Sequence, residues 1–392
     1  MAAAIRIGSI LGIPIHLHLT FLLILPLFVY IFSSPNADTE IFGIQTSFRT
    51  LDAEVWVKYA FGTAAAVIFF ATILAHEVAH SYLALKYGVR IKGITLMIFG
   101  GVSQMEGIPR QPGQEWRMAF AGPLTSMVIG AASYAAMLVL DLIDSSSVLL
   151  DGVVILLGLM ALYNLLLAAF NLIPAFPMDG GRVLRAFFAS KMPYIDATKK
   201  AARIGRYFAI GMGILGIFVN FWFILIALFV YIGATEEEQA TTISESLHGL
   251  TVKDLMSKEI QVVHPGMSVR ELHDLMLTTR YMGFPVVEGG LVGIVTLTDT
   301  HKVSKERLAD AKVGDIMTRN VITVGPDMDA AKALRLMSEK KIGRLVVTEG
   351  DRLAGIVTQN DFVRAIDTAN ARARVMRWGE QFPQQGPPMP PV

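Results

Sequence analysis

The sequence contains no cysteine among its 392 residues. Disulfide bonds, thiolate zinc sites and cysteine nucleophiles are therefore excluded, and any bound metal must be held by His, Asp or Glu side chains. Charge is also scarce, because 17% of the residues are charged, whereas a soluble domain carries about 25%. The formal net charge of +1 argues against a nucleic-acid-binding surface. Together with a mean hydropathy of +0.51, the lack of charge indicates that much of the chain is embedded in a lipid bilayer.

The apolar residues are unevenly distributed, because nearly all the long apolar runs lie before residue 235, and residues 250–370 have the composition of a soluble domain. Each run reaches the ~20 residues needed to cross the hydrocarbon core. The runs span residues 14–33, 59–84, 118–140, 152–173 and 204–233. The last run either crosses once or forms two short tilted helices that turn at Val219 and Asn220. We favour the hairpin, which gives a polytopic α-helical membrane protein with about six transmembrane helices.

Lysine and arginine residues between the runs predict the orientation of the chain by the positive-inside rule. Residues 86–117 carry five of them and residues 182–206 carry seven, whereas residues 141–152 carry none and contain three aspartates. We therefore expect a multi-pass protein of the cell membrane with its N-terminus and both basic segments in the cytoplasm. With the hairpin, residues 234–392 also lie in the cytoplasm.

The most informative motif lies inside the second apolar run, where residues 76–80 read His-Glu-Val-Ala-His. Histidines at positions i and i+4 project from one face of a helix, so His76 and His80 can bind a single Zn²⁺ ion. Glu77 is then placed to take a proton from the zinc-bound water, which becomes the nucleophile. The alternative is that both histidines only form hydrogen bonds with neighbouring helices. It leaves the carboxylate in the hydrocarbon without an explanation.

A third ligand is needed, because catalytic zinc sites hold three protein ligands and a water. The best candidate is Asp179, which follows the fourth apolar run. Pro174 and Pro177 break that helix, and the glycine pair starting at Gly180 lets the backbone turn the carboxylate inward. The alternative is an N-cap or a simple Asp-Gly turn. We favour the ligand, because the histidine motif requires an anionic partner.

Residues 94–103, between the second and third runs, are rich in β-branched residues and contain two adjacent glycines. This composition favours a strand. Non-helical backbone at membrane depth is tolerated only against protein or a watery cavity. We therefore expect a small membrane-associated β segment that approaches the zinc and presents its edge to an extended peptide. The alternative is an ordinary cytoplasmic hairpin.

His16 and His18 alternate along the chain, so they share a face only in an extended segment. On a helix their side chains diverge by about 200°. Interfacial packing or a gating role is favoured over metal binding.

The two motifs resemble those of the site-2 protease family of intramembrane zinc metalloproteases, in which a transmembrane H-E-x-x-H precedes N-x-x-P-x-x-P-x-D-G. The matching residues of the second motif are Asn171, Pro174, Pro177, Asp179 and Gly180. The resemblance covers about residues 1–235 and implies that three of the apolar runs, 59–84, 118–140 and 152–173, form the catalytic core.

The resemblance also implies roles for other residues and a reaction. Gly100 and Gly101 belong to a strand that binds substrate, and Asn171 contacts the substrate or stabilises the oxyanion. For Asn171 a helix-packing amide is the alternative. The implied reaction is hydrolysis of transmembrane segments of membrane-protein substrates, with one Zn²⁺ ion per chain. Glu77 acts as the general base and then protonates the leaving amine.

The C-terminal half contains an internal repeat. Residues 251–299 and 312–361 both begin with the pattern Val-x-Asp-x-Met and end with Gly-Ile-Val-Thr-x-x-Asp. Duplication at this spacing indicates a repeated structural unit. Both copies resemble cystathionine-β-synthase (CBS) domains, α/β modules that pair and bind adenine nucleotides.

The resemblance to CBS domains implies a site for AMP, ADP, ATP or another adenosine derivative between the copies. Thr296 and Asp299 in the first copy, and Thr358 and Asp361 in the second, match the family's phosphate- and ribose-binding positions. Arg344 is a candidate phosphate ligand, because its guanidinium is a planar fork donor. A purely structural pair, or one that forms a homodimer, is the alternative.

The expected organisation is thus a transmembrane zinc metalloprotease domain with a cytoplasmic tandem CBS module. The expected boundaries are 1–235 for the protease domain, 236–250 for a linker, 251–305 and 311–370 for the CBS domains, and 371–392 for a Pro/Gln-rich tail. The expected function is regulated intramembrane proteolysis, controlled by nucleotide at the CBS pair. The alternatives are a CBS-regulated channel or transporter, which leaves the histidine motif unexplained, and an inactive scaffold, which predicts a missing ligand or a missing Glu77.

Overall fold

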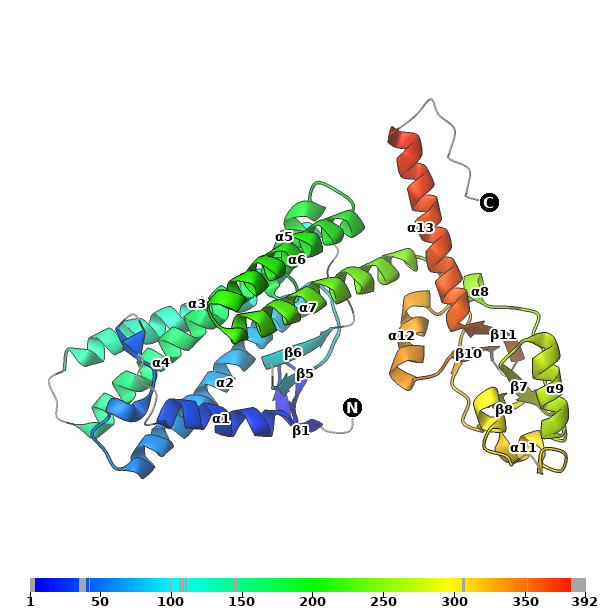
Figure 1. Cartoon of the computed structure of the whole chain (residues 1–392), viewed down its shortest axis with the longest axis horizontal. Helices are drawn as coiled ribbons and strands as arrows, with labels where there is room; N and C mark the ends of the chain where they lie inside the picture. Colours follow the sequence, from blue (N-terminus) through cyan, green and yellow to red (C-terminus); the bar gives the residue numbers. More distant parts are fainter. Residues whose placement is uncertain are drawn as a thin grey trace. The chain divides into compact units, whose positions relative to one another are not determined.

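The computed structural model describes residues 4–381 apart from residues 35–39, 42, 99, 106, 108, 110, 144–146, 305–306 and 351. The chain divides into two compact units, Met1–Gln239 and Ala240–Val392, which are shown in Figure 1. The first unit combines long helices with one small sheet, and the second is an α/β module.

The first unit contains the following elements in chain order: β1 (Ala4–Ile10), β2 (Ile13–His18), α1 (Phe21–Ser33), β3 (Glu40–Ile41), β4 (Ile44–Gln45), a 3-10 turn η1 (Phe48–Thr50), α2 (Val55–Lys86), β5 (Ile91–Met97), β6 (Gly100–Met105), α3 (Pro112–Asp141), α4 (Val148–Asn171), α5 (Asp179–Ala189), α6 (Tyr194–Phe218) and α7 (Phe221–Ser246), whose last residues enter the second unit. Among the described residues, four helices, α2, α3, α4 and α6, are long and apolar enough to cross a membrane. The chain is therefore a helical membrane protein.

The apolar run at residues 14–33 is not one helix. Its first residues belong to β2, where Ile13 and Ile15 are buried and the intervening positions are not. The remaining helix α1 has 13 residues and rises about 20 Å, less than the ~30 Å of a hydrocarbon core. The alternation in β2 has the period of a strand, which the length of the apolar run concealed.

The run at residues 204–233 divides at the predicted turn, because α6 ends before Val219 and α7 begins after Asn220. The Asn220 side chain accepts a hydrogen bond from the Trp222 amide at 3.0 Å, which caps the start of α7. Both helices are longer than predicted, with 25 and 26 residues. Figure 1 shows them side by side, and Gly216 of α6 lies against Ile224 of α7.

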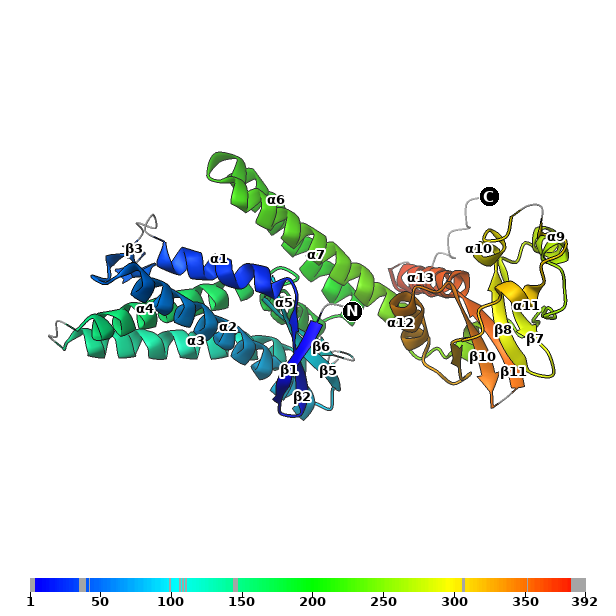
Figure 2. The same ribbon diagram turned by 90° about the horizontal axis from the view of Figure 1, so that it is seen from below.

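Residues 94–103 form a hairpin, β5–β6, rather than one strand. Gly100 has a φ of +114° beside the turn, a conformation that favours glycine. The sheet order is β1-β2-β5-β6, with β2 and β5 parallel and the other pairs antiparallel. Figure 2 shows this sheet at the C-terminal end of α2. Strand β6 is thus an edge strand beside the helices.

Helices α2, α3 and α4 pack against one another through small residues. A Cβ atom on Gly130 of α3 would meet Leu165 and Ala161 of α4, and a Cβ atom on Gly122 would meet His76 and His80 of α2. Glycines at such positions let helices approach closely, as is common between membrane helices.

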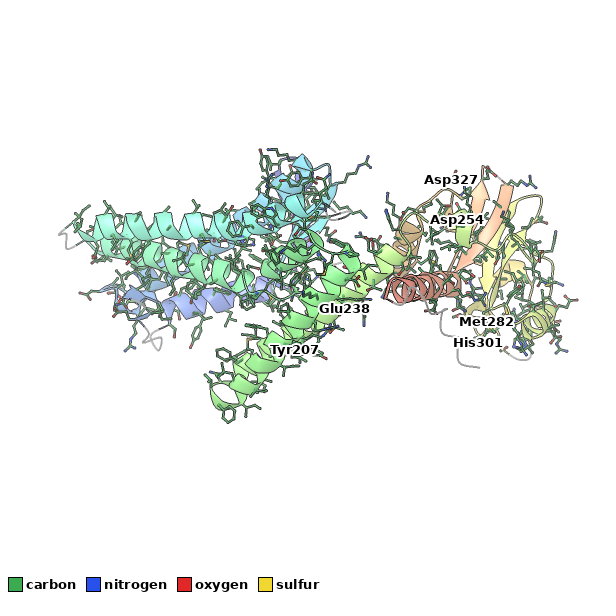
Figure 3. The ribbon with its side chains drawn as sticks, turned by 90° about the horizontal axis from the view of Figure 1, so that it is seen from above. Tyr207, Glu238, Asp254, Met282, His301 and Asp327 are labelled. Carbon is green, nitrogen blue, oxygen red and sulfur yellow. The ribbon has the colours of Figure 1, made fainter. Side chains whose placement is uncertain are left out.

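Helices α3, α5 and α7 are joined by an ion-pair network around Arg185, whose side chain is fully buried. Its Nε donates to Glu115 at 2.7 Å and its Nη1 donates to Glu237 at 2.6 Å. A second pair, Arg206–Glu238 at 2.6 Å, joins α6 to α7, and Figure 3 labels Glu238. The ion pair between Arg185 and Glu237 therefore fixes the polar half of α7 to α5, the helix that begins with Asp179.

The second unit contains two copies of one motif. Its elements are α8 (Val252–Leu255), α9 (Val269–Thr279), β7 (Gly283–Val287), β8 (Leu291–Thr296), α10 (Leu297–Thr300), α11 (Val313–Ile316), β9 (Thr323–Val324), α12 (Ala330–Lys340), β10 (Arg344–Glu349), β11 (Arg352–Thr358) and α13 (Gln359–Gln381). The N-terminal segment of each copy packs on the last strand of the other, because Met256 lies against Gly355 and Met317 lies against Gly293. This exchange relates the copies by a pseudo-twofold axis.

Helix α13 extends into the segment predicted as the start of the tail. Residues 371–381 are helical, because they contain good helix formers such as Ala, Arg and Met and no proline. The Pro-rich residues 382–392 lie outside the described part of the chain.

Candidate metal and catalytic site

His76, His80 and Asp179 converge at one point. Both histidines are buried on the same face of α2, and Asp179 is the first residue of α5. Their ligand atoms all lie within 4.8 Å of one another. Within the described residues, this is the one cluster of three His, Asp or Glu side chains arranged to hold a metal ion.

The three candidate ligand atoms form a nearly equilateral triangle. The Nε2 atoms of His76 and His80 are 3.2 Å apart, and they lie 3.3 and 3.1 Å from Asp179 Oδ2. Tetrahedral zinc with bonds of ~2.0–2.2 Å requires ligand atoms about 3.3 Å apart. The residues therefore fit a zinc ion bound above this triangle, with a fourth position open.

The other ring nitrogen of each histidine is held by α3. His80 Nδ1 donates to the Met118 carbonyl at 2.7 Å, and His76 Nδ1 lies 2.9 Å from Ser126 Oγ. Such contacts fix the orientation of the ring and leave Nε2 as the acceptor that faces the metal. Ser126 is fully buried, so this arrangement is shielded from competing water.

The backbone around Asp179 is shaped by close packing. A Cβ atom at Gly180 would meet the carbonyl groups of Leu172 and Ile173, and one at Gly181 would meet Ala175. The loop can fold onto the start of α5 only because both residues are glycines. Met178 occupies the N-cap position and Asp179 is the first residue of α5, so Asp179 is not the N-cap, and its Oδ2 atom faces Nε2 of both histidines.

Glu77 lies beside the histidines and is held by β6. Ser103 Oγ donates to Glu77 Oε2 at 2.9 Å, and Ser81 Oγ lies 3.1 Å from Ser103 Oγ. Gly101 lies against Glu77 Cγ with no room for a side chain. The edge strand therefore runs directly past the carboxylate.

A cavity of about 290 Å³ opens next to Glu77. Gly100, Gly101 and Asn171 line it together with His76 and Glu77. Asn171 also donates to the Leu167 carbonyl within its own helix at 2.9 Å. The Asn171 amide thus makes a contact within its helix, as expected of a helix-packing amide, and it also lines the cavity, as expected of a substrate-binding group.

His16 and His18 lie in β2, so their side chains share one face of the strand. His18 Nδ1 lies 2.9 Å from Thr20 Oγ1. Neither histidine belongs to the metal cluster.

In the second unit the two Thr-x-x-Asp positions form matching capping boxes. Asp299 Oδ2 accepts bonds from the Thr296 amide and hydroxyl, and Asp361 Oδ2 accepts the same bonds from Thr358. Asp299 Oδ1 also accepts a bond from Lys302 at 2.8 Å. Burial raises the pKa of Asp299, but the bonds from Lys302 and Thr296 outweigh it and leave the pKa below its usual value.

Arg344 of the second copy lies against Gly283 of the first. Burial lowers the pKa of its guanidinium group. The structure gives this group no ion pair among the residues that it describes. A desolvated cation between two copies is suited to an anionic ligand.

The sequence alone did not indicate Ser126, the Met118 carbonyl, Ser103 or the buried Arg185. Serine and arginine residues are common, and nothing in their sequence positions relates them to His76 or Asp179. Gly122 lies in the third apolar run, and nothing in the sequence showed that it contacts both histidines.

Comparisons with known proteins agree with both halves of the chain. The profile of peptidase family M50 matches residues 64–212, and that of the CBS domain matches residues 252–305 and 313–368. The zinc metalloprotease MJ0392 of Methanocaldococcus jannaschii is 37% identical over 368 residues, which are 93% of this chain and 97% of that protein. The putative zinc metalloprotease Rip3 of Mycobacterium tuberculosis is 31% identical and covers 94% of both chains.

A solved site-2 protease from Methanocaldococcus jannaschii is 37% identical and covers 60% of this chain and 95% of that chain, with a TM-score of 0.40. The chain belongs to peptidase family M50, the site-2 proteases, and carries a pair of CBS domains. It is therefore a zinc metalloendopeptidase of a family that acts on membrane proteins. The relatives that match along nearly the whole chain are zinc metalloproteases, which does not favour the channel or transporter.

Proposed function

We propose that this protein cleaves transmembrane segments of other membrane proteins within the bilayer. The observation that carries the proposal is the ligand triangle of His76, His80 and Asp179, located beside Glu77 on an apolar helix. Ionisable groups are costly in this environment and mark function. All the groups required for hydrolysis are present, which argues against an inactive scaffold.

In this proposal His76, His80 and Asp179 hold one Zn²⁺ ion. When bound, the metal polarises the scissile carbonyl group and lowers the pKa of water. Ser126 and the Met118 carbonyl keep both imidazole rings oriented. Glu77 accepts the proton of the attacking water and then delivers it to the leaving amine. Ser103 holds the Glu77 carboxylate in position through its hydroxyl group.

The substrate binds as an extended segment along the free edge of β6. The backbone of an unwound segment pairs there with Gly100 and Gly101, next to Glu77. Asn171 at the cavity wall contacts the substrate carbonyl. A transmembrane helix must unwind locally before cleavage, since its amides are otherwise paired.

The test uses a membrane-protein fragment that accumulates in cells carrying Glu77→Gln. Its cleavage by the purified enzyme is measured in proteoliposomes. We expect the wild-type enzyme to cut inside the membrane span, as located by mass spectrometry. Removal of zinc with a chelator should abolish cleavage, and added zinc should restore it. Cleavage that persists after complete removal of the metal would contradict the proposal.

The CBS unit offers a second proposal, namely that an adenine nucleotide binds between the two copies and controls cleavage. We infer that its phosphates contact Arg344, which is desolvated and lacks an ion pair among the described residues. Asp361 is the better ribose ligand, because Asp299 already binds Lys302. Of the two unequal sites, the one at Asp361 should bind more tightly.

Titration calorimetry with AMP, ADP and ATP tests the nucleotide site on the full-length protein. Arg344→Gln and Asp361→Ala should each weaken binding at least about tenfold, and Asp299→Ala should weaken it less. The exposed Arg352, replaced by Gln, is the matched control and should bind as the wild type does. Unchanged nucleotide affinity in Arg344→Gln refutes the proposed site. An unchanged cleavage rate at saturating nucleotide refutes the proposed regulation of cleavage by nucleotide.

We also propose that the chain crosses the membrane several times and that the CBS unit lies in the cytoplasm. The basic residues of segments 86–117 and 182–206 support this orientation.

A further inference from the structure

The cavity beside Glu77 has two chemically different ends. The polar side chains that line it are those of His76, Glu77 and Asn171, and the apolar ones include Phe28, Phe69, Phe70, Ile73 and Leu167; we call these two groups the polar end and the apolar end. The polar end contains the candidate catalytic groups. The apolar end contains no charged side chain from the described residues that line the cavity.

The division follows from the sequence of two helices. Ile73 precedes Glu77 by one turn of α2, about 6 Å along the axis, and the two phenylalanines precede it by about two turns. On α4, Leu167 precedes Asn171 by one turn. Each helix therefore changes from polar to apolar within one turn, on the face that lines the cavity.

The walls of the apolar end are fixed by aromatic contacts. The ring of Phe28 lies 5.4 Å from those of both Phe69 and Phe70, and Tyr163 lies 5.4 Å behind Phe69. Packed rings of this kind form a preorganised surface. The whole cavity, with both ends together, has a volume of about 290 Å³, and an apolar cavity of ~150 Å³ is enough to admit benzene.

We propose that the apolar end binds the side chain of one of the two residues that flank the scissile bond, and that this side chain is bulky and apolar. Leu, Ile, Met and Phe are the class that fits. The inference rests on the proposed protease function. Consecutive Cα atoms of the substrate are about 3.8 Å apart. When the scissile carbonyl lies beside Glu77, the side chain of a residue that flanks the scissile bond is therefore close enough to enter the cavity.

The polarity of the pocket determines which substrates it rejects. A small side chain such as Ala leaves the apolar end unfilled and loses the contacts that Leu makes. A charged side chain such as Asp is buried without a partner, which is strongly unfavourable. The pocket thus selects a cleavage position within an apolar span.

The experiment uses the full-length enzyme in proteoliposomes and a substrate whose cleavage site has been mapped. Each residue flanking the bond is changed in turn among Leu, Ala and Asp. At one of the two positions kcat/KM should fall at least about tenfold from Leu to Ala, and further from Ala to Asp. No dependence on either flanking residue overturns the inference.

Two enzyme variants test the pocket from the protein side. Leu167→Phe narrows the cavity and should lower the Leu-to-Ala ratio of kcat/KM at least about tenfold. Phe28→Ala widens it and should raise cleavage next to Trp relative to Leu. The matched control is Leu166→Phe, because Leu166 is exposed on the same helix and should keep the wild-type ratio.

The outcomes separate this inference from the proposed function. If Glu77-dependent cleavage occurs but Leu167→Phe affects Leu and Ala substrates equally, the pocket does not read a flanking side chain and is occupied by something else, such as a lipid chain. If no Glu77-dependent cleavage occurs with any substrate, the proposed function fails, and the inference fails with it.

Discussion

Gly122 sets the space in which a metal ion can bind. A Cβ atom at this position would lie against Nε2 of both His76 and His80. We expect Gly122→Ala to lower zinc affinity at least about tenfold, although alanine favours a helix more than glycine does. Metal analysis of the purified protein measures this.

The matched control is Gly113→Ala on the same helix, where nothing lies within 4 Å of the added Cβ atom. It should bind zinc as tightly as the wild type. Equal zinc affinity in all three proteins would show that Gly122 does not border the metal.

Ser103 is a positioning residue for Glu77, because its hydroxyl donates to the carboxylate at 2.9 Å. Ser103→Ala should lower kcat about tenfold, which is less than the ~10²–10⁴-fold contributed by general acid-base catalysis as a whole, and should leave KM nearly unchanged. Ser103→Thr retains the hydroxyl group and should recover most of the rate. A loss in KM instead of kcat would assign Ser103 to substrate binding.

Some residues of the site could be predicted from the sequence, and others could not. The spacing of His76, Glu77 and His80 contains its own geometry, because a helix places i and i+4 on one face. The convergence of Asp179 depends on a loop packed against Gly180, which pattern alone does not determine. The hydroxyl groups of Ser103 and Ser126 act across long sequence separations, so no local pattern reveals them.

At the scale of elements, Arg185 joins three helices through two carboxylates. Arg185→Met leaves Glu115 fully buried without its cation, and removing one partner of such a pair costs about 3–5 kcal/mol. Urea unfolding followed by helical circular dichroism in detergent should show this loss.

Arg206→Gln is the comparison, since it breaks a pair whose side chains are both 24% exposed and should cost no more than about 1 kcal/mol. Similar losses of stability in the two variants would indicate that burial does not determine how much the Arg185 network contributes to the free energy of unfolding.

The elements show where periodicity is informative and where it fails. The turn at Val219 and Asn220 was predictable, because an overlong apolar run with one polar residue near its middle favours a hairpin. Strand β2 was concealed, because its residues from Pro14 onward were counted in the same apolar run as α1. The pairing of β2 with β5 joins segments far apart in the sequence, and only tertiary structure determines it.

At the scale of the whole molecule, the absence of cysteine makes topology directly measurable. Single cysteines introduced at Leu142, after α3, and at Ser190, after α5, would be the only thiols in the chain. In intact cells a membrane-impermeant maleimide should label Leu142→Cys, and it should label Ser190→Cys only after permeabilisation.

Asp274→Cys in the CBS unit should behave like Ser190→Cys. Labelling of either one in intact cells would reverse the proposed orientation or place the CBS unit outside.

We propose that Glu77 is the general base for the attack of water on a transmembrane peptide bond, beside a zinc that His76, His80 and Asp179 would hold. The most direct measurement is the rate at which zinc-loaded wild-type enzyme and Glu77→Gln cleave the same single-span substrate in proteoliposomes. Glu77→Gln should retain one zinc per chain, and its cleavage rate should fall at least about 10²-fold. Cleavage by zinc-loaded Glu77→Gln at the wild-type rate would contradict it.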